Sequence, residues 1–511
     1  MTATSPHTST PAGAGRPALG RIAVLAVEAC GMTRSPRLLA VVQAAALAAG
    51  LVSLTTAAPS QAAPPAGAIS INVEFVTNLP ELQTAISLNF IGDTMFVSAV
   101  SGIYSYDVSN PRAPKLLGAL PHYIWENEDV DVDAARHLLF VSRDPRGFTS
   151  PATTAFPYGA VEVYDVSNPA VFKPVSATLL PTGHTTTCVG GCRWTWTGGP
   201  ATSPVDTHDW GFGRPLYGLD MKDPSHPVQC AHPLDTNRSD GKTSYAHDVQ
   251  VDPAGIAWVS GDGGVRGYWV TGKHRDPVDG KVKTATGCDP VPYAGGGTVL
   301  GRDDTRGGLM HNAWRDMNAK VDGVRGAVLY ATEEVTGASS CAGYGKFAIY
   351  DLRGSFHGEG WRNIAQTHFR LKQLSTWTPE GQAGSSGCDS AHYFTDRGDQ
   401  VLAGAYYTQG TRFLDVSNPR HPRQIAYYRP NDANTWAAYW HKGYVFIADF
   451  GRGVDVIRLT GKAARLGAAP STAAVTAPLL PAGRSLADLG RSKDPVWAWM
   501  CGGTPASAPV R

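Results

Sequence analysis

Residues 103–111 read Ile-Tyr-Ser-Tyr-Asp-Val-Ser-Asn-Pro, and this phrase returns twice further along the chain. Residues 161–169 read Val-Glu-Val-Tyr-Asp-Val-Ser-Asn-Pro, and residues 411–419 read Thr-Arg-Phe-Leu-Asp-Val-Ser-Asn-Pro. Each copy predicts a short strand that ends at Asp and is followed by an Asn-Pro turn. A supersecondary unit that is copied several times is typical of repeat architectures such as the β-propeller.

Seven copies of this strand can be placed along the chain. Short apolar strands precede the copies, as at residues 85–91 and 95–99, and another follows the turn, as at residues 115–120. Four short strands per unit are typical of a propeller blade. We therefore predict an all-β fold over residues 63–461, a seven-bladed β-propeller of four-stranded antiparallel blades. The seven strands are expected to end at or near Asp107, Asp165, Asp220, Trp269, Asp351, Asp415 and Ile457.

The last unit lacks a fourth strand, whereas residues 71–76 form a spare strand at the front. We predict that this N-terminal strand completes the seventh blade and closes the ring. The units are somewhat longer than the usual blade of about 40–50 residues, and we expect insertions to account for the excess. These are predicted at residues 144–158, 188–213, 273–309 and 370–388, as loops that project from the binding face.

The N-terminal residues predict export. A basic segment at residues 32–37 precedes an Ala-rich apolar run at residues 38–54, and Ser60-Gln61-Ala62 has the small-residue pattern of a cleavage site. The apolar run is short for a membrane anchor. We predict that residues 1–62 are a disordered leader plus signal peptide cleaved near Ala62, with Met32 as a candidate true start. The mature protein is then secreted or held in the cell envelope without a transmembrane span, and residues 462–511 form an Ala/Pro/Gly-rich tail.

Cysteine usage agrees with an oxidising compartment, where disulfides persist and staple long loops. The Gly-Gly spacer between Cys188 and Cys192 favours a tight disulfide over a metal site. Sequence order suggests two further pairs, although connectivity does not follow from sequence. The predicted arrangement is Cys188 with Cys192, Cys230 with Cys288, and Cys341 with Cys388, with Cys501 left unpaired.

Composition narrows the range of partners. The chain has 511 residues, a formal net charge of +1 and 17% charged residues, so it lacks the basic surplus of a nucleic-acid-binding protein. No Gly-x-Ser-x-Gly elbow is present, and the Gly-rich stretch at residues 261–264 fits a hairpin turn, not a phosphate loop. We predict a monomer whose partner is a small molecule, a peptide or a glycan.

The Asp-Val-Ser-Asn-Pro strands resemble the LVIVD repeat, which is named for an equivalent Leu-Val-Ile-Val-Asp strand. The chain looks like a secreted bacterial LVIVD-repeat protein, and the resemblance covers residues 71–459. It is strongest in the three copies quoted above. The resemblance implies a β-propeller, but it implies little about function, because sites and not folds carry chemistry.

A histidine recurs where the first strand of a unit begins, at His184, His247, His311 and His392. First strands line the central channel of a propeller, so equivalent positions in successive blades form a ring at one end of the channel. We therefore expect these four imidazoles to converge near one channel mouth.

Polar residues accompany the histidines. The second unit carries Glu126, Glu128 and Asp129 in the register of the histidines, and Asp248 and Asn312 directly follow two of them. All five belong to the predicted channel-mouth site. A weaker candidate is the Glu-Glu pair at residues 333–334, which ends a second strand, although neighbouring residues on a strand point in opposite directions.

Two interpretations of the histidines stay open. Neutral imidazole is the commonest side-chain metal ligand, and several converging rings suit Cu, Zn, Ni or Fe. Alternatively, each histidine fastens its own blade by hydrogen bonds. The first and seventh units lack the histidine, which weakens the structural role.

These interpretations lead to different functions. The first is a secreted or cell-envelope binding module that uses the channel mouth and the blade insertions. The second is a metal-dependent, Cu-type oxidoreductase that resembles the selenium-binding protein and methanethiol oxidase group, also propellers with channel histidines. In that function His184, His247, His311 and His392 would hold one transition metal, and Glu128 or Asp129 would orient a ligand or move a proton. A passive repeat protein without a ligand is the third.

Overall fold

The computed structural model describes residues 65–465 except for several segments, and all of the described residues lie in one compact unit. The predicted leader at residues 1–62 and most of the predicted tail lie outside the described residues. Within residues 65–465 the structure does not describe residues 122–127, 129, 145–158, 181, 200–215, 233, 235–245, 262–263, 277–278, 294–307, 336–344, 354–371, 381–382 and 385–386.

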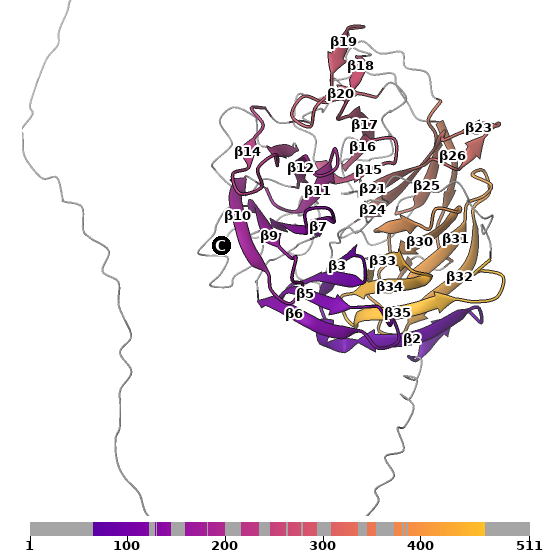
Figure 1. Ribbon diagram of the computed structural model, residues 1–511. Helices are drawn as coiled ribbons and strands as arrows, with labels where there is room; N and C mark the ends of the chain where they lie inside the picture. The colour runs from indigo at the N-terminus through magenta and orange to yellow at the C-terminus, as the bar shows by residue number, and fades with distance from the viewer. Residues whose placement is uncertain are drawn as a thin grey trace, which may run out of the picture. The chain divides into compact units, whose positions relative to one another are not determined.

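Seven antiparallel sheets follow one another around a ring, which confirms the predicted seven-bladed β-propeller (Figure 1). The strands of each blade are given in order from the central axis outward. Blade one comprises β3 (Ala85–Ile91), β4 (Thr94–Ala99), β5 (Gly102–Asp107) and β6 (Lys115–Pro121). Blade two comprises β7 (Val130–Asp133), β8 (Leu138–Arg143), β9 (Gly159–Asp165) and β10 (Lys173–Leu180). Blade three comprises β11 (Thr185–Val189), β12 (Trp194–Gly198), β13 (Tyr217–Asp220) and β14 (Val228–Gln229).

Blades four to six carry small additional hairpins. Blade four comprises β15 (Ala246–Val251), β16 (Ile256–Gly261), β17 (Gly264–Trp269) and β20 (Val291–Pro292), with the hairpin β18 (Lys273–Arg275) and β19 (Val282–Thr284). Blade five comprises β21 (Gly308–Asp316), β24 (Val328–Val335), β25 (Phe347–Asp351) and β26 (Lys372–Trp377), with the hairpin β22 (Lys320–Val321) and β23 (Val324–Arg325). Blade six comprises β29 (Phe394–Asp396), β30 (Val401–Ala405), β31 (Thr411–Asp415) and β32 (Arg423–Pro430), and the hairpin β27 (Ala383–Gly384) and β28 (Gly387–Cys388) precedes it.

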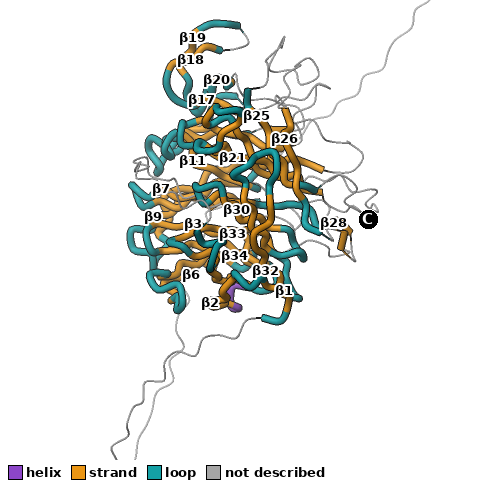
Figure 2. Tube along the Cα trace, turned by 90° about the vertical axis from the view of Figure 1, so that its right-hand side faces the viewer, coloured by secondary structure: helices purple, strands orange, loops and turns teal. Residues whose placement is uncertain are grey.

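Both ends of the propeller meet in blade seven. Its inner strands are β33 (Thr435–His441), β34 (Tyr444–Asp449) and β35 (Gly453–Leu459), and its outer strand is β2 (Val73–Leu79) from the N-terminal side. This confirms the predicted closure. An unpredicted strand, β1 (Gly67–Ile69), adds a fifth strand to blade six by pairing with β32. Figure 2 shows the predominance of strands, and η1 (Pro80–Leu82) is the only helix among the described residues.

The recurrent phrase folds as two successive side-chain turns. In blade one Asp107 Oδ1 accepts a hydrogen bond from the backbone N–H of Ser109 (2.8 Å), and Asn110 Oδ1 accepts one from Arg112 (3.1 Å). Such Asx turns reverse the chain at low cost, which explains the Asp and the Asn of the phrase. The Val between them, Val108 in blade one, is buried. The repeat is therefore the sequence signature of one turn.

The hydrophobic core lies between the blades. Seven clusters of buried apolar residues are found among the described residues, and each joins at least two neighbouring blades. Leu88 of blade one and Phe446 of blade seven, for example, belong to the same cluster. Each sheet thus buries both faces, which explains why the inner strands are apolar on both sides. The innermost strands contact one another around the ring, from β3 through β33 and back to β3.

Three of the four predicted insertions were wrong in part, because they contain blade strands. Residues 188–213 include β12, residues 273–309 include β20, and residues 370–388 include β26. β12 reads Trp-Thr-Trp-Thr-Gly, and its threonines give little hydrophobic signal. β20 has only two residues, and β26 is a largely exposed outer strand. Residues 144–158 do separate β8 from β9, as predicted.

Two of the predicted disulfides are present. Cys188 is bonded to Cys192 at the turn between β11 and β12, and Cys230 is bonded to Cys288, which ties blade three to blade four. Cys341 and Cys501 lie outside the described residues, so the third pair stays a prediction. No helix in the described part of the chain is long and apolar enough to cross a membrane.

Candidate metal centre

The four histidines occupy one and the same position in their blades. In blades one, three, four and seven the equivalent residue comes just before the one that pairs with the fifth residue of the second strand. Extending the registers of blades two, five and six gives the same position for their residues. In several blades the register shifts at this point, and such a bulge turns a side chain out of the regular alternation. The seven equivalent residues are Ile86, Glu128, His184, His247, His311, His392 and Trp436, and each is 0% exposed.

This ring has a polar and an apolar sector. Blades two to six contribute one carboxylate and four imidazoles, whereas blades one and seven contribute Ile86 and Trp436. Neighbouring rings lie against each other along the arc, with centroid separations of 4.9 Å for His184 and His247, 4.3 Å for His247 and His311, and 3.8 Å for His311 and His392. The structure therefore brings the four predicted histidines together.

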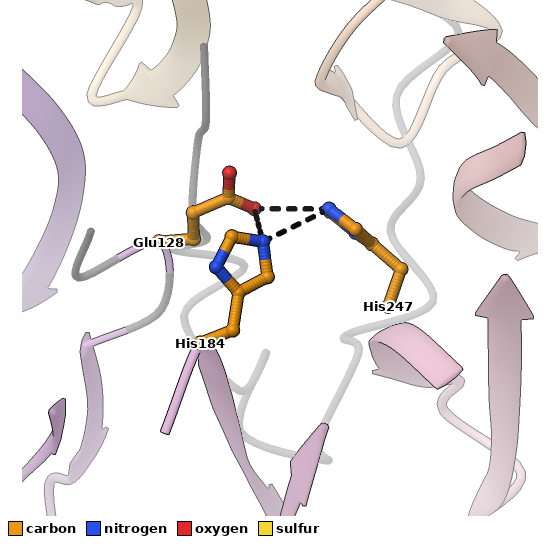
Figure 3. A group of neighbouring side chains, drawn as sticks. All are labelled: Glu128, His184 and His247. Carbon is orange, nitrogen blue, oxygen red and sulfur yellow. Dashed lines mark hydrogen bonds and ion pairs between the residues drawn. The ribbon is translucent and has the colours of Figure 1, made fainter. Parts of the chain in front are cut away.

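Three donor atoms form a nearly equilateral triangle (Figure 3). Glu128 Oε2 lies 3.2 Å from His184 Nε2 and 3.3 Å from His247 Nε2, and the two nitrogens are 3.2 Å apart. The corners of a tetrahedron around a metal ion with bonds of about 2.0–2.1 Å are about 3.3–3.4 Å apart. The triangle thus has the size of one face of such a tetrahedron.

Contacts on the far side of His184 fix the state of its ring. His184 Nδ1 lies 3.1 Å from Asp144 Oδ2, and a carboxylate in this place favours the tautomer with the proton on Nδ1. A neutral ring then presents a lone pair at Nε2 toward Glu128. Gly199 provides the space for this ring, because a Cβ at that position would clash with the Cβ of His184.

Lone pairs that face one another in a dry site repel unless a cation lies between them. A proton on one imidazole nitrogen would turn one edge of the triangle into a hydrogen bond and would leave the other edges without one. One metal ion at its centre would satisfy Glu128, His184 and His247 together. The donor set therefore fits a divalent transition metal, for which imidazole and carboxylate are common ligands.

Glu334 adds a second carboxylate beside His311 and His392. Glu334 Oε1 lies 3.7 Å from His392 Nε2, and Oε2 lies 4.0 Å from His311 Nε2. The hydroxyl of Tyr407 donates to Glu334 Oε1 and holds this carboxylate. His392 Nδ1 donates to the carbonyl oxygen of Trp436 at 2.9 Å, which leaves Nε2 facing the axis.

His311 is the most informative of the four histidines. Within the described part of the chain, neither of its ring nitrogens has a hydrogen-bond partner, and the ring is fully buried. Burial, reinforced by the neighbouring imidazoles of His392, His247 and His184, holds the pKa of His311 well below its usual value. The ring is therefore neutral near pH 7, which is the state that binds metals. A fastening role, with hydrogen bonds to its own blade, is not what this ring shows.

Of the remaining predicted site residues, two are next to histidines of the ring and two lie outside the described residues. Asp248 Oδ2 accepts from Gln250 Nε2 at 2.9 Å, and Asn312 Nδ2 donates to the carbonyl oxygen of Phe394 at 3.3 Å. Asp248 belongs to no close group of His, Cys, Asp and Glu ligand atoms among the described residues. Glu126 and Asp129 lie outside the described residues.

Sequence reasoning gave Glu334 little weight and missed Asp144 and Tyr407. The Glu-Glu pair does point in two directions, because Glu333 accepts from the backbone N–H of Gly345 while Glu334 faces His311. Which of the two faces the axis depends on the strand register. Asp144 and Tyr407 lie just beyond β8 and β30 and carry no motif.

No protein-family model matches the chain, and no curated protein matches it. Solved structures show partial similarity to it. The β-propeller domain of Cps50 (Swd1) from Myceliophteria thermophila is 9% identical with a TM-score of 0.44, and the match covers 74% of this chain and 97% of that domain. The periplasmic gluconolactonase PpgL from Pseudomonas aeruginosa is 13% identical with a TM-score of 0.46, and the match covers 73% of this chain and 91% of PpgL. These similarities carry no inference about function.

Proposed function

We propose that this β-propeller is a metal-dependent oxidoreductase that acts on a small substrate at the central axis. The observation that carries the proposal is the triangle formed by Glu128, His184 and His247, with edges of 3.2–3.3 Å. Two imidazoles and one carboxylate with further positions open are typical of non-haem Fe(II) centres that activate oxygen. Copper is the second candidate, because imidazole also suits it.

The surrounding residues would serve the centre in distinct ways. Asp144 holds the tautomer and the orientation of His184, and such partners tune ligand basicity. Full burial of the ring excludes water, which strengthens electrostatic interactions and protects reactive species. A bound iron or copper ion would supply one-electron chemistry that no side chain of this cluster supplies alone.

Metal content tests the proposal directly. Protein purified without a His-tag is expected to contain at least one iron or copper ion per chain by elemental analysis. His184→Ala is expected to lower the content of the triangle's ion to less than about 0.1 per chain, since ligand loss removes most of the binding free energy. His421→Ala, at an exposed histidine, serves as the matched control. Metal-free wild-type protein that also fails to take up either ion would overturn the proposal.

The reaction class needs its own test. Oxygen consumption by the metal-loaded protein would be measured with small thiols first. Thiols are chosen because the selenium-binding protein and methanethiol oxidase group, which the channel histidines resemble, includes thiol oxidases. The metal-free protein is the control. Zinc as the only metal bound, without oxygen uptake, would leave a metal site but exclude an oxidoreductase, because zinc has no redox chemistry.

A binding module is the second candidate function. One observation favours it: the long connections from β8 to β9, β12 to β13 and β24 to β25 leave the second strands at the end of the propeller where the cluster lies. Loops at that end are common binding surfaces. Glycan arrays and pull-downs would compare the whole protein with a variant whose β8–β9 connection is replaced by a short Gly linker. Equal binding by both proteins would count against this function.

A further inference from the structure

The axis holds more donor groups than the triangle uses. Three close groups occur among the described residues: Glu128, His184 and His247; Glu128, His311 and His392; and His247, His311 and Glu334. Within each group all ligand atoms lie within 4.8 Å of one another. None of these groups combines His184 with His311 or His392.

A single ion cannot serve all of these donors. Donor atoms on opposite sides of an ion with bonds of about 2.0–2.2 Å are at most about 4.4 Å apart. An ion in the triangle of Glu128, His184 and His247 therefore leaves His392 without a role in binding it. His311, whose two nitrogens have no hydrogen-bond partner in the described part of the chain, would also keep an unused lone pair.

We propose that the axis has a second metal position, formed by His311, His392 and Glu334, beside the one in the triangle. The proposal rests on the proposed function and deepens it, because it makes the centre a two-metal site for divalent transition-metal ions. The two oxygens of Glu334 face different imidazoles, at 3.7 Å from His392 Nε2 and 4.0 Å from His311 Nε2. Each separation is within the span of one ion. The ion would take both oxygens of Glu334, because no single oxygen of Glu334 forms a close group with both His311 and His392 among the described residues.

Hydrogen bonds to the outer sides of His392 and Glu334 also support the second metal position. The Nδ1 atom of His392 is engaged by the carbonyl oxygen of Trp436, so Nε2 is the atom available for a metal. Tyr407 donates to Glu334 Oε1 and orients its carboxylate. These outer contacts match the pattern in which a second partner fixes each metal ligand.

Glu128 connects the two positions. Its Oε2 atom belongs to the triangle and lies 4.0 Å from His311 Nε2. The carboxylate also belongs to the group with His311 and His392. A carboxylate shared in this way is a common feature of two-metal sites, and the two carboxylates together offset part of the charge of two divalent ions.

The test is the number of ions per chain. Metal-free protein without a His-tag is titrated with Cu²⁺, dialysed, and analysed for metal and protein. We expect two ions per chain in the wild type and one in Glu334→Gln, which keeps the shape of the side chain and its contact with Tyr407. His184→Ala is expected to lose the other ion, and His421→Ala is expected to keep both.

The outcomes separate this proposal from the proposed function. One ion in the wild type, lost in His184→Ala and kept in Glu334→Gln, would overturn the second position and leave the proposed function intact. No ion in the wild type would overturn both. Two ions in Glu334→Gln would overturn the assignment of Glu334.

Electron paramagnetic resonance gives an independent readout. Two Cu²⁺ ions that share neighbouring ligands couple magnetically, so the fully loaded wild type is expected to show a broadened or weakened signal. Glu334→Gln loaded with Cu²⁺ is expected to show the sharp signal of an isolated ion. A sharp signal that integrates to two isolated ions in the wild type would overturn the proposal. Far-UV circular dichroism of each variant checks that it is folded.

Discussion

At the scale of single residues, the environment of each ring nitrogen decides what the histidines can do. His184 has its outer nitrogen on Asp144 and its inner nitrogen in the triangle, whereas His311 has no such outer partner among the described residues. Identical residues at equivalent positions thus differ in their hydrogen-bond partners. The position on the strand could be predicted from sequence, but these differences arise from contacts between blades.

Replacement of Asp144 tests the outer contact. Asp144→Asn keeps the size of the side chain but removes the acceptor that fixes the proton on His184 Nδ1. We expect metal affinity to fall about 10–100-fold, as is usual when such a partner is lost. Competition with a chelator measures the dissociation constant. Asp223→Asn, at an exposed carboxylate, is the control, and equal affinities in the two variants would contradict the role of Asp144.

A histidine far from the cluster predicts a pH effect on stability. The ring of His441 stacks on Phe90 with centroids 4.2 Å apart. Burial, with a smaller effect from Lys442 and opposed by Asp93, lowers the pKa of His441 from 6.5 to about 4. The unfolded chain therefore binds more protons than the folded one between these values, so stability is fully present above pH 6.5 and falls as the pH falls toward 4.

The measurement compares wild type with His441→Phe by urea unfolding at several pH values. Because the ring is partly exposed, we expect the wild type to lose about 1–2 kcal/mol relative to the variant between pH 7 and pH 4. A difference in unfolding free energy that does not change with pH would contradict the assignment.

At the scale of strands, the recurrent phrase predicted most of the fold. The third strands β5, β9, β13, β17, β25 and β31 end where the sequence placed them, and β35 runs on to Leu459. Alternation and turn residues carry this information locally. Short or Thr-rich strands such as β12 and β20 could not be predicted, because their burial comes from neighbouring blades and not from their own hydrophobicity.

The closing strand gives a graded truncation experiment. A chain that starts at residue 65 keeps every described strand, one that starts at residue 72 lacks β1, and one that starts at residue 80 also lacks β2. We expect the last to lose cooperative unfolding and to aggregate, because β35 becomes an uncovered edge strand. Differential scanning calorimetry and size-exclusion chromatography measure this. Equal melting of all three chains would show that β2 is dispensable.

The two disulfides should differ in their effect on stability. The bridge between Cys230 and Cys288 spans 58 residues and joins two blades, whereas that between Cys188 and Cys192 spans 4 residues within one turn. A longer closed loop restrains the unfolded chain more strongly. We expect Cys230→Ala with Cys288→Ala to cost about 2–4 kcal/mol, and the other double variant to cost less. Chemical unfolding measures both, and the reverse order would contradict this account.

At the scale of the whole molecule, the repeat decided the architecture but not the chemistry. The convergence of four histidines followed from the ring arrangement, because first strands of successive blades meet at the axis. The contribution of Glu334 did not follow, since it depends on the register of a second strand. The resemblance to LVIVD-repeat proteins, export and cleavage near Ala62 stay predictions.

The meeting of β2 and β35 in one sheet places the beginning and the end of the folded chain side by side. The order in which the blades occur along the gene is therefore not fixed by the finished ring. A circularly permuted gene, with these two ends joined by a linker and new ends opened at an exposed turn such as the one after Asp107, would encode the same set of blade neighbours. Any of the seven sheets could then serve as the seam.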